Sequence, residues 1–301
     1  MSRYWPLLLL LASVWGASYL FIKVAVDGGL EPGPLMCSRA AIGAAILCGY
    51  LARTMGRRRA VAELRASWRQ WSVLGLIGTA IPFWLVAWGE THVDSGIAAV
   101  AQSTVPLFTV LLGLRFLPHE PLTRGRVLGL AVGLVGVAVL AGGHPAGGWW
   151  SIAGILAVVL SSIAYACGGI IGQRSVSDTP GPVLATGAMI SAAVSLLPLA
   201  LLEGPSSSPD GGAVLSLLAL AVLGTAFAQL VMYRLINLVG ARRMSLVTYL
   251  MPGFALAYGA VLLDEPVTAP VLAGLGLILA GVALGSGTIA AARRKPVEVP
   301  G

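Results

Sequence analysis

The sequence predicts an all-α integral membrane protein of ten transmembrane helices, arranged as two inverted five-helix repeats around a central cavity. Of its 301 residues, 57% are hydrophobic and only 10% are charged, whereas soluble domains carry about 25% charged residues. The charged residues fall in clusters separated by apolar runs of about 20 residues, the length that spans a bilayer core. In addition, segments of the first half of the chain recur in the second half.

Apolar runs between charged or Pro/Gly-rich breaks define the ten helices. The breaks GGLEPGP, GGHPAGG and EGPSSSPDGG hold residues that end helices and favour turns. Because these breaks are short, consecutive helices should be antiparallel. The first apolar run follows Arg3 without a small-residue cleavage motif, so we expect a retained helix and not a signal peptide. The expected helices lie at residues 5–26, 34–52, 71–89, 96–116, 125–142, 151–172, 182–202, 213–236, 243–263 and 268–290.

Basic and acidic residues fall on opposite sides of this arrangement. If the N-terminus is inside, all but two of the 19 lysine and arginine residues lie in inner segments, and the exceptions are Lys23 and Arg39 near the outer ends of their helices. Because cytoplasmic flanks retain positive charge, we predict that both termini are cytoplasmic and that residues 291–301 form a cytoplasmic tail. The acidic residues expected outside are Asp27, Glu31, Glu90, Asp94, Glu203, Asp210, Asp264 and Glu265.

Several functional classes find no support. The net charge of +7 does not predict a nucleic-acid partner, because the basic residues lie between apolar spans and not on a water-exposed face. The sequence has no Ser/His/Asp order, HExxH helix, nucleotide-binding loop or metal-ligand cluster. We therefore expect no enzyme activity, no cofactor and no metal. Cys37, Cys48 and Cys167 lie inside apolar runs and are expected to be small buried residues.

The two halves share an internal repeat, which we place at residues 1–142 and 151–290. Gly78-Thr79-Ala80 matches Gly224-Thr225-Ala226, and Pro106 and Pro252 follow at the same offset. Because each half has an odd number of spans, the second half must enter the membrane from the opposite side. Such inverted repeats are common in secondary transporters, whose substrate site lies between the repeats. Gene duplication also builds channels and scaffolds, so the repeat alone leaves those classes open.

Three segments resemble those of a known family. SVWGASYLFIKVAV at 13–26 has a Trp-Gly pair followed by a lysine, and the halves end in the similar segments FLPHEPLTRGRVLGLAVGLVGVAVL and LLDEPVTAPVLAGLGLILAGVAL. Together with ten spans, these segments resemble EamA-type transporters of the drug/metabolite transporter (DMT) superfamily over nearly the whole chain. Length and aromatic content are similar to the YddG-type bacterial amino-acid exporter branch. In the second half Tyr165 stands near the position of Trp15, and Gln173 replaces Lys23.

The resemblance implies a secondary transporter of the bacterial cytoplasmic (inner) membrane. Its fifth and tenth helices would be peripheral, and the other eight would surround a cavity. The implied activity is export of small metabolites by alternating access, with aromatic or other apolar amino acids as the first expectation. The alternatives are a multidrug or other metabolite exporter driven by proton antiport and, outside transport, a lipid-modifying enzyme or a passive pore.

We expect polar and aromatic residues within the helices to line the cavity. Lys23 either faces the cavity or extends to the outer interface. Arg39 either pairs at the outer surface with a carboxylate or binds substrate, and pairing is the first expectation. The possible partners are Asp27, Glu31, Glu90 and Asp94. The amides of Gln102 and Gln229 should face inward, toward either substrate or a neighbouring helix. Aromatic walls suit amphipathic ligands. The cavity candidates are Trp15, Tyr19, Lys23, Trp84, Trp88, Gln102, Tyr165, Gln229, Tyr233 and Tyr249.

Prolines, glycines and ionisable groups complete the prediction. Pro82, Pro106 and Pro252 should kink their helices, as fixed bends or as hinges. Glycines in the fifth and tenth helices make small faces for scaffold packing, in a monomer or in a homodimer formed through those two helices. No carboxylate or histidine is expected within a helix core, which favours a facilitator with Lys23 shaping the outer cavity. The rival is proton antiport that uses Glu90, Asp94, Glu120 or Asp264.

Overall fold

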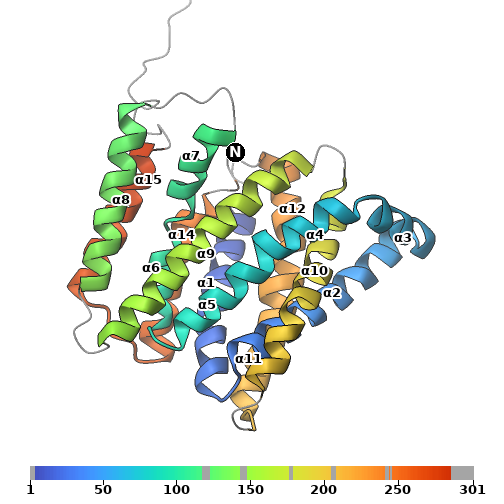
Figure 1. Ribbon diagram of the computed structural model, residues 1–301, viewed down its shortest axis with the longest axis horizontal. Coiled ribbons are helices and arrows are strands. Elements are labelled where there is room, and N and C mark those ends of the chain that lie inside the picture. The colour runs from blue at the N-terminus through green and yellow to red at the C-terminus, as the bar shows by residue number, and fades with distance from the viewer. Residues whose placement is uncertain are drawn as a thin grey trace, which may run out of the picture.

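The computed structural model describes residues 4–116, 123–142, 148–175, 179–204, 208–240, 244 and 246–285. Within these ranges all regular structure is helical, with no strand (Figure 1). The expected tail at 291–301 and the candidate Glu120 lie outside the described residues, as does the end of the last expected helix beyond Gly285.

The first half has five spans, of which the third and fourth are divided. In the third span α4, η1 and α5 follow one another without a gap, and η1 is a π-helical segment. In the fourth span a turn at residues 103–104 separates α6 from α7. The elements are α1 (Trp5–Asp27), α2 (Pro32–Met55), α3 (Arg57–Ala66), α4 (Trp68–Gly75), η1 (Leu76–Ala80), α5 (Ile81–Glu90), α6 (Ser95–Gln102), α7 (Val105–Phe116) and α8 (Arg124–Gly142).

The second half has five corresponding spans in the same order. Among the described residues, eight helical spans are long and apolar enough to cross a bilayer, and α14 and α15 are two shorter apolar helices. The predicted all-helical fold of ten spans is therefore confirmed. The elements are α9 (Gly148–Ser175), α10 (Gly181–Glu203), α11 (Gly211–Ala221), η3 (Val222–Phe227), α12 (Ala228–Val239), α14 (Val247–Leu262) and α15 (Ala269–Gly285).

Helix packing follows the repeat. Helix α1 packs on α14 and on the α11–α12 span, and its counterpart α9 packs on α6, α7 and α5. In the two remaining counterpart pairs the members pack on each other: α2 packs on α10, and α8 packs on α15. In Figure 1, α1 runs down from the N-terminus whereas α9 runs up. The contacts are thus exchanged when the two halves are exchanged, which is the packing expected of repeats related by a two-fold axis in the membrane plane.

Both repeats contain a π-helical segment on the shared Gly-Thr-Ala motif, as η1 and η3. A π-helical turn holds an extra residue and leaves a carbonyl outside the ordinary i→i−4 ladder. Pro82, which follows η1, lacks an N–H and so cannot restore that ladder. In η3 the Thr225 hydroxyl donates to the Leu220 carbonyl oxygen at 3.0 Å. The π-helical segment is therefore accompanied by a proline in the first half and by a threonine hydroxyl bond in the second half.

The other candidate prolines also lie at or near irregular points. Pro106 is the second residue of α7, directly after the break between α6 and α7, and its counterpart Pro252 lies inside α14. A proline inside a helix removes one backbone hydrogen bond. Whether these positions bend during transport stays a prediction.

One helix was missed from the sequence. Helix α3 follows α2 after Gly56, whose φ of 82° belongs to the left-handed region that glycine tolerates. It is short and rich in arginine, so a search for apolar runs of span length passed over it. Its buried Ala60 packs with Leu51 of α2 and Val183 of α10. Helix α3 is therefore a short amphipathic helix whose buried face packs on α2 and α10.

Helices α8 and α15 lie side by side at one edge of the bundle (Figure 1). Their glycine faces meet each other: a Cβ on Gly129 would collide with the backbone of Gly281 and Gly285, and one on Gly136 would lie 2.9 Å from the Gly274 carbonyl oxygen. The small residues thus serve packing within one chain. A homodimer through these helices stays a prediction, and its contacts would have to come from their other faces.

Candidate substrate cavity

A cavity of about 370 Å³ lies between the two halves. Its wall is mostly apolar and aromatic with a few polar side chains, which is the usual composition of a small-molecule site. The lining residues are Trp15, Ser18, Tyr19, Ile22, Arg39, Gly78, Thr79, Phe83, Val86, Gln102, Val105, Tyr165, Met189, Gly224, Thr225, Gln229, Met244, Thr248 and Met251.

Repeat-matched positions supply much of this wall. The Gly-Thr pair of η1 and that of η3 both line the cavity, and so do Val105 and its counterpart Met251. Trp15 of α1 lines it together with Tyr165 of α9, which stands at the matching place in the second half. The cavity is therefore built symmetrically from the two repeats.

Arg39 of α2 is the charged residue of this wall, and it is only 6% exposed. Its Nε donates to Thr225 Oγ1 at 2.8 Å. Its guanidinium carbon lies 3.9 Å from the centroid of the Phe83 ring, and Nη1 lies 3.7 Å from Met36 Sδ. The expected pairing with an outer carboxylate is wrong: no described carboxylate lies within 4.0 Å of this guanidinium. The side chain turns toward the second half and does not reach the outer surface.

The two candidate glutamines both line the cavity but have different partners. Gln102 Oε1 accepts a hydrogen bond from Ser161 Oγ at 2.7 Å, and Gln102 Nε2 donates to Ser162 Oγ at 3.2 Å. This amide therefore joins α6 to α9. By contrast, Gln229 Oε1 is buried and has no hydrogen-bond partner among the described residues. Gln102 thus bonds a neighbouring helix, whereas the described residues offer Gln229 Oε1 no such bond.

Five of the ten cavity candidates line the cavity, namely Trp15, Tyr19, Gln102, Tyr165 and Gln229. The other five lie elsewhere. Tyr233 packs against Gly181 at the start of α10, and Tyr249 is half-buried against the main apolar core.

Lys23, Trp84 and Trp88 lie toward the bundle end that contains residues 28–31, 91–94, 208–210 and 263–268, here called the acidic end. Lys23 Nζ donates to Asp27 Oδ1 at 3.0 Å and to the Glu90 carbonyl oxygen at 3.1 Å. Trp84 Nε1 donates to Glu203 Oε1 at 2.7 Å. Trp88 stacks on Trp84 and makes a tilted ring contact with His92. These side chains hold the acidic end together and do not form the cavity wall.

Carboxylates at the acidic end join the two halves. Glu203 at the end of α10 accepts from the Gly33 N–H at the start of α2, in addition to Trp84. Glu265 accepts from Ser95 N, Ser95 Oγ and Gly96 N at the start of α6, at 2.7 to 3.0 Å. A carboxylate at a helix N-terminus satisfies amide groups that lack partners within the helix and meets the positive end of the helix dipole.

Glu90 is the acidic residue whose environment the sequence did not predict. It ends α5 with 0% exposure, and neither carboxylate oxygen has a hydrogen-bond partner among the described residues. The carboxylate lies at the end of its span, as expected from the sequence, but the sequence did not predict its burial.

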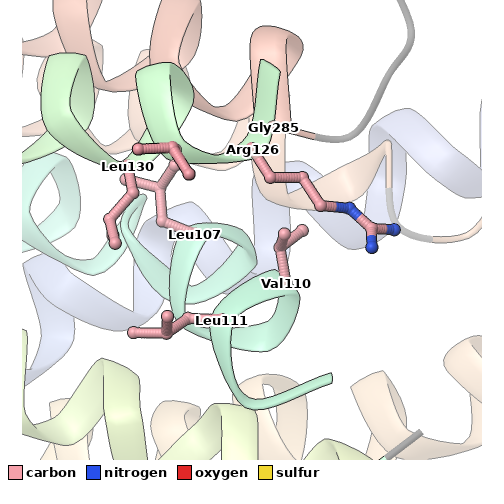
Figure 2. Close-up of a pocket in the computed structure, with 7 residues that line it drawn as sticks. Leu107, Val110, Leu111, Arg126, Leu130 and Gly285 are labelled. Atoms are coloured by element: carbon pink, nitrogen blue, oxygen red, sulfur yellow. The ribbon is translucent and has the colours of Figure 1, made fainter. Parts of the chain in front are cut away.

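Figure 2 shows a smaller pocket of about 100 Å³ between α7, α8 and the end of α15. Its walls are aliphatic side chains such as Leu107, Val110 and Leu130. The one charged side chain, Arg126, extends its guanidinium away from Leu107 and Leu111 in that view. With no polar group directed into it, this pocket offers a polar metabolite nothing to bind.

Comparison with solved structures gives the fold. One crystal structure matches with a TM-score of 0.68 and 21% identity, covering 96% of this chain and 98% of the matched chain.

Two curated relatives match over almost their full length. A protein of Salmonella typhimurium named probable amino-acid metabolite efflux pump is 27% identical over 299 residues, covering 92% of each chain. A protein of Streptantibioticus cattleyicolor named probable terminal-alkyne amino-acid exporter is 29% identical over 307 residues, covering 99% of this chain and 97% of its own.

The EamA-like transporter family matches this sequence twice, at residues 3–142 and again at 152–287. The two matches begin and end within a few residues of the expected repeats at 1–142 and 151–290. Since nearly every described helix is covered, the chain belongs to the EamA-like transporter family.

Proposed function

We propose that the protein exports small amphipathic metabolites, amino acids first among them, across the cytoplasmic membrane by alternating access. The observation that carries this proposal is the cavity between the halves, lined by repeat-matched residues, aromatic side chains and a few polar groups. In inverted-repeat transporters the repeats rock about a fixed central site. Two relatives named for amino-acid metabolite efflux and amino-acid export support the substrate class.

The cavity size also suits this class. A volume of about 370 Å³ lies at the lower end of the 300–1,000 Å³ typical of small-molecule sites. Tyr19, Phe83 and Tyr165 would contact the apolar end of the substrate, while the polar groups would hold its charged end. A wall of this kind favours several related apolar amino acids over one, because ring and thioether surfaces adapt to different aliphatic shapes.

The test is counterflow in proteoliposomes loaded with unlabelled leucine, phenylalanine or tryptophan. A carrier should accumulate the external labelled amino acid transiently, and the flux should saturate. A passive pore would give linear flux without counterflow, and a lipid-modifying enzyme would give no flux. Absence of counterflow for every amino acid, combined with movement of an unrelated class such as sugar phosphates, would contradict the proposal.

We also propose that both termini face the cytoplasm. The support is the charge distribution: described arginines of α3, α4 and α8 lie at the end opposite the acidic end, and cytoplasmic flanks retain positive charge. A reporter domain fused after Gly301 should be active inside the cell. Activity on the periplasmic side would reverse the orientation.

Energy coupling has two candidates. We propose a facilitator, since no ionisable carboxylate or histidine lines the cavity itself. Proton antiport is favoured by one observation, the buried and unpartnered Glu90, which sits at the end of α5 one turn beyond the lining residue Val86. An imposed pH gradient decides between them: uptake indifferent to the gradient supports a facilitator, whereas accumulation above equilibrium supports antiport. In the second case Glu90→Gln should abolish the accumulation and leave counterflow intact.

A further inference from the structure

The cavity contains a buried cation that forms no salt bridge with any carboxylate in the described part of the chain. Arg39 is 6% exposed, and no described carboxylate lies within 4.0 Å of it. Removing a charge from water is expensive unless it is paired, and charged residues inside membrane spans usually serve a functional pathway. In this chain the charge is retained on the wall of the cavity between the two halves.

The orientation of Arg39 is fixed by contacts that use only part of its hydrogen-bonding capacity. Nε donates to Thr225 Oγ1, and the guanidinium plane rests on Phe83. Thr225 is itself held because its hydroxyl donates to the Leu220 carbonyl oxygen within η3. A guanidinium has five N–H donors. The contact of Nη1 with Met36 Sδ at 3.7 Å is weak, so the Nη groups remain to bind an anion.

A second polar group on the same wall lacks a partner. Gln229 follows Thr225 by one helical turn, so both project from the same face of the η3–α12 span. Its Oε1 is buried without a hydrogen-bond partner, although it lines the cavity. Buried polar groups in native structures are nearly always bonded, and both ends of the other cavity amide, Gln102, are hydrogen-bonded, to Ser161 and Ser162. An open acceptor in the same cavity as Arg39 indicates a ligand that brings an N–H donor.

We propose that Arg39 binds the carboxylate of the transported substrate and that Gln229 Oε1 accepts a hydrogen bond from the neighbouring amino group. The substrate class is then an α-amino acid, or a compound with the same carboxylate and N–H pair, whose apolar end lies against the aromatic wall. This inference rests on the proposed transport function. It assigns the carboxylate to Arg39 and not to Lys23, whose ammonium group is already bound to Asp27 and the Glu90 carbonyl.

The first experiment measures competition in wild-type proteoliposomes. Labelled phenylalanine counterflow is inhibited with unlabelled phenylalanine, with phenylalaninamide, which lacks the carboxylate, and with 3-phenylpropionate, which lacks the amino group. The amide should inhibit at least tenfold more weakly than phenylalanine, because it cannot form the charge-assisted fork with a guanidinium. Equal inhibition by the amide overturns the inference without any variant. If wild-type protein moves no amino acid at all, the proposed function fails.

The second experiment uses Arg39→Gln, with Arg53→Gln as matched control on an exposed turn of the same helix. Arg39→Gln should raise the half-saturating phenylalanine concentration at least tenfold and remove the preference for phenylalanine over its amide. Arg39→Lys should recover part of the preference, because it keeps the charge but loses the planar fork. Arg53→Gln should match wild type. An unchanged preference in folded Arg39→Gln protein overturns the assignment while counterflow still upholds the proposed function.

Gln229→Leu tests the amino group separately. It should weaken inhibition by phenylalanine and leave inhibition by 3-phenylpropionate unchanged, which a general packing defect would not do. If Arg39→Gln fails to fold, Thr225→Val keeps the charge but removes the hydroxyl that orients Nε, and a several-fold loss of the preference for phenylalanine over its amide is expected. A Thr225→Val protein with wild-type preference, like equal inhibition by the amide in wild type, counts against the inference.

Discussion

The two Gly-Thr-Ala segments differ in what the opposing helix presents to them. Each forms a π-helical segment on the cavity wall, in η1 and in η3. Facing η3, helix α2 presents Arg39, which bonds Thr225. The matched position of α10, counted from the PGPL and PGPV segments, is Gly187, and Trp71 of α4 occupies the space beside it. The backbone repeat is thus symmetric, whereas the charge lies on one side only. A symmetric cavity with an asymmetric charge gives a substrate one preferred orientation.

The largest expected effect comes from breaking the symmetric packing beneath these segments. Gly78 meets Gly168 of α9 so closely that a Cβ on Gly168 would collide with the Gly78 backbone. Gly168→Val should therefore cost about 3 kcal/mol or more, since backbone cannot move aside for an overpacked side chain. The matched residue in α1 is Ser18, which packs on Gly224, and Ser18→Ala should cost less than about 1 kcal/mol. Thermal unfolding in detergent measures both, and a stable Gly168→Val protein would contradict this packing.

The next effect concerns the carboxylate that joins the halves at the acidic end. Glu265 accepts three hydrogen bonds from Ser95 and Gly96. Glu265→Gln should cost about 2 kcal/mol, because the amide nitrogen would face N–H donors and the charge at the helix start is lost. Its exposed neighbour Asp264, with φ at 55°, is the control: Asp264→Asn should stay within about 0.5 kcal/mol because asparagine also tolerates the left-handed region. Equal unfolding temperatures for the two variants would argue against the cap.

A smaller difference separates the two threonines of the repeat. Thr225→Val removes the hydroxyl that bonds both Arg39 Nε and the Leu220 carbonyl oxygen, so about 1.5 kcal/mol should be lost. For the Thr79 hydroxyl the described part of the chain offers no such pair of bonds, and Thr79→Val should change stability by less than about 0.5 kcal/mol. Identical losses would mean that the charge does not distinguish the halves.

The smallest effect on stability is expected at the two glutamines. Gln102→Leu should cost about 1 kcal/mol, because it leaves the hydroxyls of Ser161 and Ser162 with one bond fewer. Gln229→Leu should be neutral in unfolding, since Gln229 Oε1 has no partner to lose, but it should weaken transport. A destabilised Gln229→Leu protein with normal counterflow would assign this amide to structure.

Much of the fold follows from the sequence because span length and charge clustering are direct consequences of the bilayer. The ten spans, the repeat at Gly-Thr-Ala and the inward positions of Trp15 and Tyr165 all come from such patterns. Periodicity does not say which way a side chain near a helix end turns. Lys23 and Arg39 had equal standing on the sequence, yet Lys23 bonds Asp27 whereas Arg39 turns into the cavity.

Hydrogen bonds between the two halves could not be predicted either, because a sequence pattern does not show which helices meet in space. The acceptor of Arg39 lies on η3, and the donors to Glu203 and Glu265 lie on α2, α5 and α6. These contacts depend on how two repeats pack in space. The amphipathic α3 was missed for a different reason, because it is too short and too charged to register as a span.

Protection of a cavity thiol by substrate tests whether substrate occupies the cavity at the π-helical segments. In a protein with Cys37, Cys48 and Cys167 replaced by serine, Thr79→Cys places one thiol on the cavity wall. Saturating amino acid should slow alkylation of this thiol at least fivefold, and should not change alkylation of the control Thr54→Cys at the exposed end of α2. An alkylation rate at Thr79→Cys that is unchanged at concentrations saturating counterflow would contradict the central claim, because the substrate would then pass elsewhere.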